Sequence, residues 1–91
     1  MNQIFIGLGA NVGDPVRQLN CAATRIAELP DTTLTRCSSL YESLPMGPQD
    51  QPNFINGCIE IDSQLSPMRL LESLQDIETT MGRIRTRRWG E

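Results

Sequence analysis

The sequence predicts a small α+β domain, in which two helices cover one face of a largely antiparallel sheet. Two segments alternate apolar and polar residues with the period of a strand, and two others carry apolar residues at helical spacing behind a capping residue and a proline. With 91 residues and 38% hydrophobic content, residues 1–91 fit a single domain with a modest core.

The first part of the chain predicts a strand, a helix and a second strand. Three aliphatic residues share one face of a strand over 3–8, and a glycine-bearing turn follows. Asp14 is a favourable N-cap for a helix that begins at Pro15 and is closed by Pro30. Threonines early in 32–41 favour a second strand there.

A long loop and a third strand precede the second helix. Three prolines and a glycine within 42–53 exclude a helix or a central strand, and such loops in compact domains are usually functional or disordered. Residues 54–62 alternate as a strand with one polar face. The second helix begins behind Ser66 and Pro67 and ends at Gly82.

The tail over 83–91 is expected to be irregular. The predicted order is then βαββα, whereas a ferredoxin-like βαββαβ fold has one more strand. The sequence therefore predicts a ferredoxin-like domain whose last strand is missing from this chain.

Composition narrows the cellular context. Three scattered cysteines and the absence of histidine argue against a zinc site and favour buried thiols in a reducing compartment. Neither an apolar run of about 20 residues nor a signal-peptide pattern is present. These features predict a cytoplasmic protein that does not partner a membrane.

Charge is concentrated by position. Residues 1–82 hold four arginines and ten acids, whereas residues 83–91 hold four arginines and one acid. Lysine is absent, and guanidinium groups suit bidentate phosphate contacts. A basic cluster on an acidic body predicts a localised anion site rather than a nucleic-acid surface.

Three groups of residues carry candidate chemistry, each with a simpler alternative. The tail cluster could fold over a polyphosphate, or it could be a basic tail without a ligand. An aromatic ring and an amide on the polar face of the third strand could grip a flat heterocycle, but ordinary sheet surfaces look the same. Two polar residues, Gln75 and Glu78, share a helix face where a solvated flank is the favoured interpretation.

The glycine-rich turn over 7–13 favours a structural role. Its Gly-x-Gly-x-x-x-Gly spacing is one residue longer than the common dinucleotide-binding form. Asp14 would also repel a pyrophosphate at the helix N-terminus. A tight turn that allows close approach of the backbone is therefore preferred.

Several segments together match one enzyme family. They are residues 6–14, 38–43, 45–56, 70–71, 75–78, 81–83 and 88–91. The proline- and glutamine-containing loop that leads into Phe-x-Asn at 54–56 is the most specific of them. Through these segments the chain resembles the N-terminal portion of the 6-hydroxymethyl-7,8-dihydropterin pyrophosphokinases of folate biosynthesis.

The resemblance implies transfer of pyrophosphate from ATP to the hydroxymethyl group of a reduced pterin, with Mg²⁺. It implies pterin contacts from Ser43, Leu44, Pro45, Met46, Phe54 and Asn56. It implies ATP contacts or a closing loop from Gln75, Glu78, Arg83, Arg85, Arg88 and Trp89, with Arg83 as the catalytic residue. Ser43 and Phe54 depart from the threonine and tyrosine that are common in the family.

The resemblance also places the family's magnesium-binding Asp-x-Asp beyond Glu91. We therefore expect this chain to contain no metal site and to be inactive by itself. Two alternatives belong to other classes. One is an RNA-binding module, which would need aromatic residues and basic charge on the sheet face. The other is an inactive structural remnant of the family.

Overall fold

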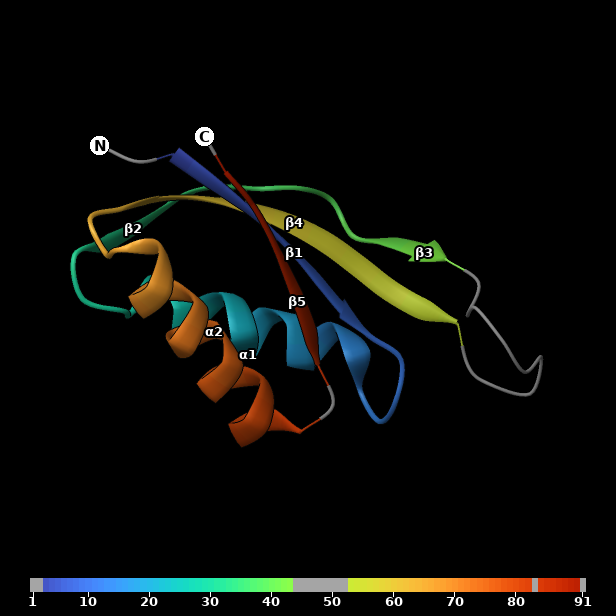
Figure 1. The fold of residues 1–91 in the computed structure, drawn as a ribbon. Helices are drawn as coiled ribbons and strands as arrows, with labels where there is room; N and C mark the ends of the chain where they lie inside the picture. Colours follow the sequence, from blue (N-terminus) through green and yellow to red (C-terminus); the bar gives the residue numbers. More distant parts are fainter. Residues whose placement is uncertain (1–2, 44–52, 83, 91) are drawn as a thin grey trace.

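A computed structural model of the protein describes residues 3–43, 53–82 and 84–90, and of 88–90 the backbone alone. The fold is α+β, as predicted, with two helices and five strands (Figure 1). In chain order these are β1 (Gln3–Ala10), α1 (Pro15–Ala27), β2 (Thr32–Cys37), β3 (Tyr41–Ser43), β4 (Phe54–Ser63), α2 (Pro67–Met81) and β5 (Arg85–Gly90).

The sheet has the order β2-β4-β1-β5, and every pairing is antiparallel. The short strand β3 pairs with the first residues of β4, beyond the end of β2. Both helices lie on the same side of the sheet in Figure 1, which leaves the other face open. One face of the sheet is therefore available for a ligand site.

The predicted helix signals are confirmed. The carboxylate of Asp14 accepts a hydrogen bond from the backbone N–H of Arg17 at 3.3 Å, and the Ser66 hydroxyl accepts one from Arg69 at 3.2 Å. Gly82 ends α2 in the left-handed region, with φ 81°. Glycine adopts this conformation without the steric cost that a side chain imposes.

The core lies between the helices and the sheet. Alternate residues of β1 and β4 face the apolar stripes of the two helices, and thirteen hydrophobic side chains among the described residues are buried. They are Ile4, Ile6, Leu8, Ala10, Leu19, Ala22, Ile26, Ile59, Ile61, Leu70, Leu74, Ile77 and Ile84. In the described part of the chain, neither helix is long and apolar enough to cross a membrane.

The prediction of an irregular tail, with the last strand missing, is wrong. β5 pairs antiparallel with β1 over Arg85–Gly90, on the edge of β1 that β4 leaves unpaired. Ile84, immediately before this strand, is buried with 5% of its surface exposed. Because side chains alternate along a strand, Thr86 faces the helices, as the buried Ile84 does. The backbone pairing of β5 with β1 and these two inward side chains together outweigh the repulsion among the arginines.

The second predicted strand is interrupted. A register shift occurs between Leu34 and Arg36, and β2 ends at Cys37 before β3 resumes the edge. Between them Leu40 lies against Gly57, where an added Cβ would stand 3.0 Å from a Leu40 methyl carbon. Gly57 therefore leaves room for Leu40 at the point where the edge of the sheet passes from β2 to β3.

Candidate ligand site on the open sheet face

The open face gathers candidate side chains from four strands in one row. Tyr41 on β3 pairs with Asn56 on β4, Asn56 pairs with Gly9 on β1, and Gly9 pairs with Arg85 on β5. Directly paired residues of antiparallel strands project on the same face, so these four positions share it. Segments that are far apart in the sequence thus meet at one site.

Next to this row, the aromatic ring and the hydroxyl of the predicted pterin site stand together. Phe54 pairs with Ser43 at the start of β4. The Asn56 Nδ2 group donates a hydrogen bond to the Ser43 Oγ atom at 2.7 Å. The structure therefore brings together Ser43, Phe54 and Asn56, three of the residues for which the family resemblance implies contacts with a pterin.

Gly9 lies on β1, between the open-face side chains of β4 and those of β5. We call it and Gly7 the glycine floor because neither carries a side chain. A Cβ atom on Gly9 would lie 3.1 Å from Asn56 Oδ1 and 3.9 Å from a Phe54 ring carbon. Gly7 lies two residues earlier on β1 and pairs with Arg87 and Cys58. At Gly7 and Gly9 the open face of β1 therefore carries no side chain, whereas the paired positions on β4 and β5 do.

The sequence analysis did not anticipate this role for Gly9. Gly7 was predicted inside the strand over 3–8 and Gly9 in the tight turn that follows it, whereas both glycines lie inside β1. A glycine within a strand often marks close approach of a ligand or of another chain segment. That signal was present, but it could not be separated from the turn without the pairing of β1.

Arg85 brings a cation to the aromatic ring. Its Cζ atom lies 5.7 Å from the centroid of Phe54. This distance is within the range of about 6 Å at which a guanidinium is attracted to an aromatic face. A residue predicted to contact ATP thus adjoins one predicted to contact pterin.

Glu78 and Gln75 lie away from this face. Both belong to α2, which covers the opposite side of the sheet (Figure 1). Glu78 Oε2 accepts hydrogen bonds from the Thr86 backbone N–H at 2.7 Å and from its hydroxyl at 2.8 Å. Gln75 is exposed. In this structure Glu78 joins α2 to β5, and neither residue contributes to the open face.

For the remaining predicted site residues, the structure describes the backbone at most. Leu44, Pro45, Met46 and Arg83 lie outside the described residues. Arg88 and Trp89 belong to β5, where their backbones pair with Ile6 and Phe5. For these six residues the assignment is still a prediction.

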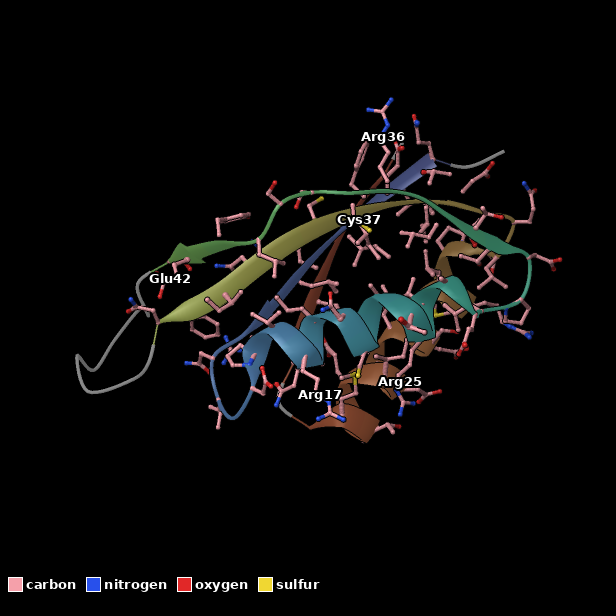
Figure 2. All side chains as sticks on the ribbon, turned by 180° about the vertical axis from the view of Figure 1, so that it is seen from behind. Arg17, Arg25, Arg36, Cys37 and Glu42 are labelled. Carbon is pink, nitrogen blue, oxygen red and sulfur yellow. The ribbon has the colours of Figure 1, made fainter. Side chains whose placement is uncertain are left out.

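A second polar cluster on the open face is structural. Glu60 is 7% exposed, and its carboxylate accepts hydrogen bonds from Gln3 at 2.7 Å and from Thr35 at 2.9 Å. Arg36 lies 3.6 Å from the same carboxylate, and Figure 2 shows Arg36 on the side of the sheet away from α1. These contacts satisfy the buried charge, so the cluster needs no ligand.

Aromatic residues are more numerous on the open face than Phe54 alone. Phe5 is 40% exposed and Tyr41 is 58% exposed, and their strand partners Glu60 and Asn56 lie on this face. An RNA-binding module would need such aromatic residues on the sheet face, so Phe5 and Tyr41 add to Phe54 as residues of that kind.

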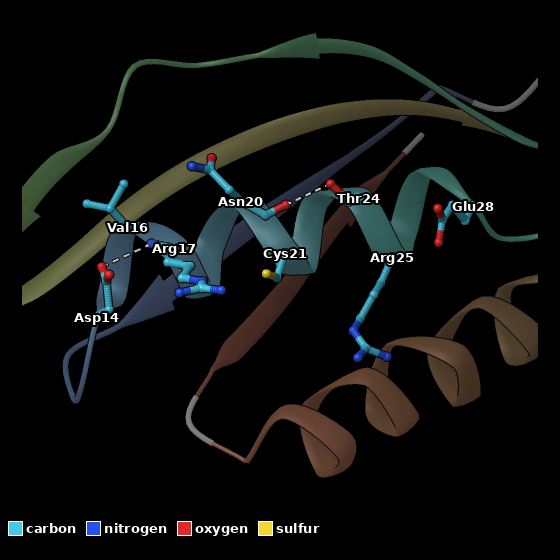
Figure 3. Close-up of a pocket in the computed structure, with 8 residues that line it drawn as sticks. All are labelled: Asp14, Val16, Arg17, Asn20, Cys21, Thr24, Arg25 and Glu28. Carbon is cyan, nitrogen blue, oxygen red and sulfur yellow. Dashed lines mark hydrogen bonds between the residues drawn. The ribbon is translucent and has the colours of Figure 1, made fainter.

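A separate groove runs along α1, on the side of the molecule that carries the helices (Figure 3). Its volume is about 690 Å³, and it is open to solvent along its length. It is lined by Asp14, Val16, Arg17, Asn20, Cys21, Thr24, Arg25 and Glu28. None of these residues was a predicted site residue, and all belong to one helix and its flanks.

Within the described ranges, no group of three or more His, Cys, Asp and Glu side chains could hold a metal ion. We assign no step to a metal held by the described residues.

Comparison with known proteins identifies the family. The family model for 7,8-dihydro-6-hydroxymethylpterin-pyrophosphokinase matches residues 5–91. The chain belongs to this pyrophosphokinase family. The match extends over nearly the whole chain and contains both β4 and β5.

Two relatives carry the name 2-amino-4-hydroxy-6-hydroxymethyldihydropteridine pyrophosphokinase. The protein from Haemophilus influenzae is 49% identical over 87 residues, which cover 96% of this chain and 54% of the relative. The protein from Pseudomonas aeruginosa is 42% identical over 90 residues, which cover 99% of this chain and 56% of the relative. The chain thus spans about half the length of these pyrophosphokinases.

Among solved structures, the C-terminal domain of the MgtC protein from Mycobacterium tuberculosis has a similar fold. Its TM-score is 0.62 at 9% identity, and the match covers 100% of this chain and 88% of that domain. At this identity the likeness concerns the fold alone.

Proposed function

We propose that the whole protein transfers pyrophosphate from ATP to the hydroxymethyl group of 6-hydroxymethyl-7,8-dihydropterin. The observation that carries this proposal is the grouping of Ser43, Phe54 and Asn56 on one sheet face of a pyrophosphokinase-family chain. Phe54 offers a ring for stacking, and Asn56 offers an amide for the polar edge of a heterocycle. Leu44, Pro45 and Met46 are proposed to complete the pterin site.

We assign the nucleotide side to the arginine-bearing strand. Arg85 borders the open face, and Arg83, Arg88 and Trp89 are proposed to join it around ATP because they match the family's pattern. Guanidinium groups neutralise the charge of a polyphosphate during transfer, which is the role proposed for Arg83. Gln75 and Glu78 are proposed to contact ATP, as the family's pattern implies, and Glu78 also holds this strand in place through Thr86.

We propose Mg²⁺ as the accompanying metal, with its protein ligands outside the residues described here. When bound, the ion would neutralise part of the negative charge of the ATP phosphates. We also propose a ferredoxin-like topology. The strand order β2-β4-β1-β5 and the position of both helices on one side of the sheet support it. A cytoplasmic location is proposed from the family's metabolic role.

The test is formation of AMP by the full-length protein supplied with ATP, Mg²⁺ and the reduced pterin. We expect AMP to appear only when the pterin is present, with one diphosphorylated pterin per AMP. The isolated 91-residue chain is the matched control and is expected to be inactive. Release of AMP without pterin, or a full-length protein that makes none, would contradict the proposed function.

A further inference from the structure

The outer face of α1 carries an exposed cysteine between two exposed arginines. Cys21 lies about one helical turn from Arg17 and one from Arg25, and all three residues are exposed. The sequence favoured buried thiols, and the exposed Cys21 corrects this expectation. The three residues line the groove along α1 (Figure 3). This groove lies on the helix side of the sheet, opposite the open face that carries the proposed pterin site.

The charged residues of this face are arranged symmetrically about Cys21. Arg17 and Arg25 are each four residues away from it. Asp14 and Glu28, which cap the two ends of the helix, are each seven residues away. The helix therefore presents acid, arginine, cysteine, arginine and acid in the same order from either end.

These charges are not neutralised within the described part of the chain. The ion pair found there joins Arg36 to Glu60, so Arg17 and Arg25 have no carboxylate partner. The Asp14 carboxylate accepts a hydrogen bond from the backbone N–H of Arg17, which leaves its negative charge in place. Both signs of charge are therefore available to a partner of α1.

The symmetric pattern is complementary to a second copy of the same helix. At about 100° per residue, Arg17 and Glu28 lie on one flank of Cys21. Arg25 and Asp14 lie on the other flank. In an antiparallel pair with a two-fold axis at Cys21, each flank meets the same flank of the second copy with its ends exchanged. Arg17 then meets Glu28 of the second copy, and Arg25 meets its Asp14, whereas like charges are on opposite flanks.

The expected spacing at the centre of such a pair brings the two Cys21 thiols together. Packed helices have axes about 8–10 Å apart, and their Cα atoms lie about 2.3 Å from each axis. Facing Cα atoms are therefore roughly 3.5–5.5 Å apart. This range overlaps the Cα separation of about 4.4–6.8 Å found in disulfides. An oxidant can thus trap this contact covalently.

We propose that α1 docks on α1 of a second copy of the protein, as an antiparallel pair centred on Cys21. A pair of 13-residue helices buries less than the roughly 1,200–2,000 Å² of a stable interface. The association is therefore weak and reversible while the thiols are reduced. It goes beyond the proposed function, because it uses none of the residues assigned to pterin or ATP.

Disulfide trapping in the full-length protein tests the geometry. Diamide oxidises two thiols to one disulfide and is itself reduced to the hydrazine, which takes up both thiol protons. Two proteins are compared, one with Cys21 as its single cysteine and one with Cys37, and serine replaces every other cysteine. Both thiols are exposed. We expect the Cys21 protein to form a covalent dimer faster than the Cys37 protein, as measured on non-reducing gels.

Charge reversal in the Cys21 protein tests the ion pairs. Each exposed pair corresponds to about 1.5–5-fold in a binding constant, and the two-fold axis doubles its effect, so Arg17→Glu should slow dimer formation about 2–25-fold. Addition of Glu28→Arg exchanges the charges within one pair and should restore the rate to within about 2-fold. Glu42→Arg is the matched control, because it gives the same net charge but lies on the edge strand β3, and it should restore nothing (Figure 2).

Three results would overturn the proposal. If Cys21 of the full-length protein does not react with N-ethylmaleimide, another segment of the same protein covers this face. Equal rates for the Cys21 and Cys37 proteins would mean that the dimers arise from unspecific collisions. Equal rescue by Glu28→Arg and Glu42→Arg, or rescue by neither, would mean that α1 does not pair with α1 in this register.

Discussion

Asn56 and Ser43 are ordered by a hydrogen bond between their side chains in the proposed pterin site. The 2.7 Å hydrogen bond from Asn56 Nδ2 to Ser43 Oγ holds the amide in one orientation. Gly9 leaves room for the amide oxygen, which stands 3.1 Å from where a Cβ would be. Less side-chain freedom is lost on binding when the group is already ordered, so the pair favours affinity.

Replacement of Asn56 by alanine should weaken pterin binding in the full-length protein. The ligand's polar edge would lose its partner, which costs about 1–3 kcal/mol for a buried group. Calorimetric titration with the pterin measures the change, and thermal unfolding monitors stability alongside. Ser43→Ala keeps the amide and removes only its support, so a smaller loss is expected. Equal pterin affinity in Asn56→Ala and the unsubstituted protein would reject the assignment.

At the scale of elements, the junction between α2 and β5 determines where Arg85 and Arg87 point. The Glu78 carboxylate accepts two hydrogen bonds from Thr86, at 2.7 and 2.8 Å, on the helix side of the sheet. Because successive strand residues alternate in direction, holding Thr86 inward directs Arg85 and Arg87 outward. Glu78 thereby affects the open face without reaching it.

This junction can be measured with a double-mutant cycle. Glu78→Ala leaves two partly buried donors without their partner and should lower the free energy of unfolding by about 1.5–3 kcal/mol. Thr86→Val removes one of the two bonds and should cost about 0.5–1.5 kcal/mol. In urea denaturation the two effects should be non-additive. Glu72→Ala, at an exposed position of the same helix, is the control, with a change within about 0.5 kcal/mol.

For the whole molecule, stability rests on the layer between the sheet and the two helices. Ile6 of β1 and Ile61 of β4 are fully buried, and both face α1 and α2 with the rest of the core. The opposite face carries the glycine floor and the polar candidates. One face of the sheet therefore carries the core, and the other carries the proposed binding site.

Ile61→Ala tests this division. The substitution creates a cavity in a closely packed layer and should lower the free energy of unfolding by about 2–5 kcal/mol. Met68→Ala removes a side chain of similar size that is 65% exposed, and it should change stability by no more than about 0.5 kcal/mol. Chemical denaturation of the full-length protein compares them. Similar losses in both variants would mean that this layer does not dominate folding.

The sequence by itself determined the elements whose signals are local. The caps at Asp14 and Ser66, the alternation in 54–62 and the helical stripes predicted both helices and the two central strands because propensity and period act within a few residues. The family's motif residues also pointed to Ser43, Phe54 and Asn56. These features needed no knowledge of which strand pairs with which.

The tertiary structure alone decided the pairing of distant segments. β5 forms because β1 has a second edge, which β4 leaves unpaired. The arginine-rich sequence of the tail gives no sign of that edge. The same pairing places Gly9, which was predicted in a turn, inside a strand on the open face. It also brings Arg85 of β5 close to the ring of Phe54 on β4. It also placed Glu78 behind the sheet. Such relations depend on register between strands many residues apart, which local sequence patterns do not encode.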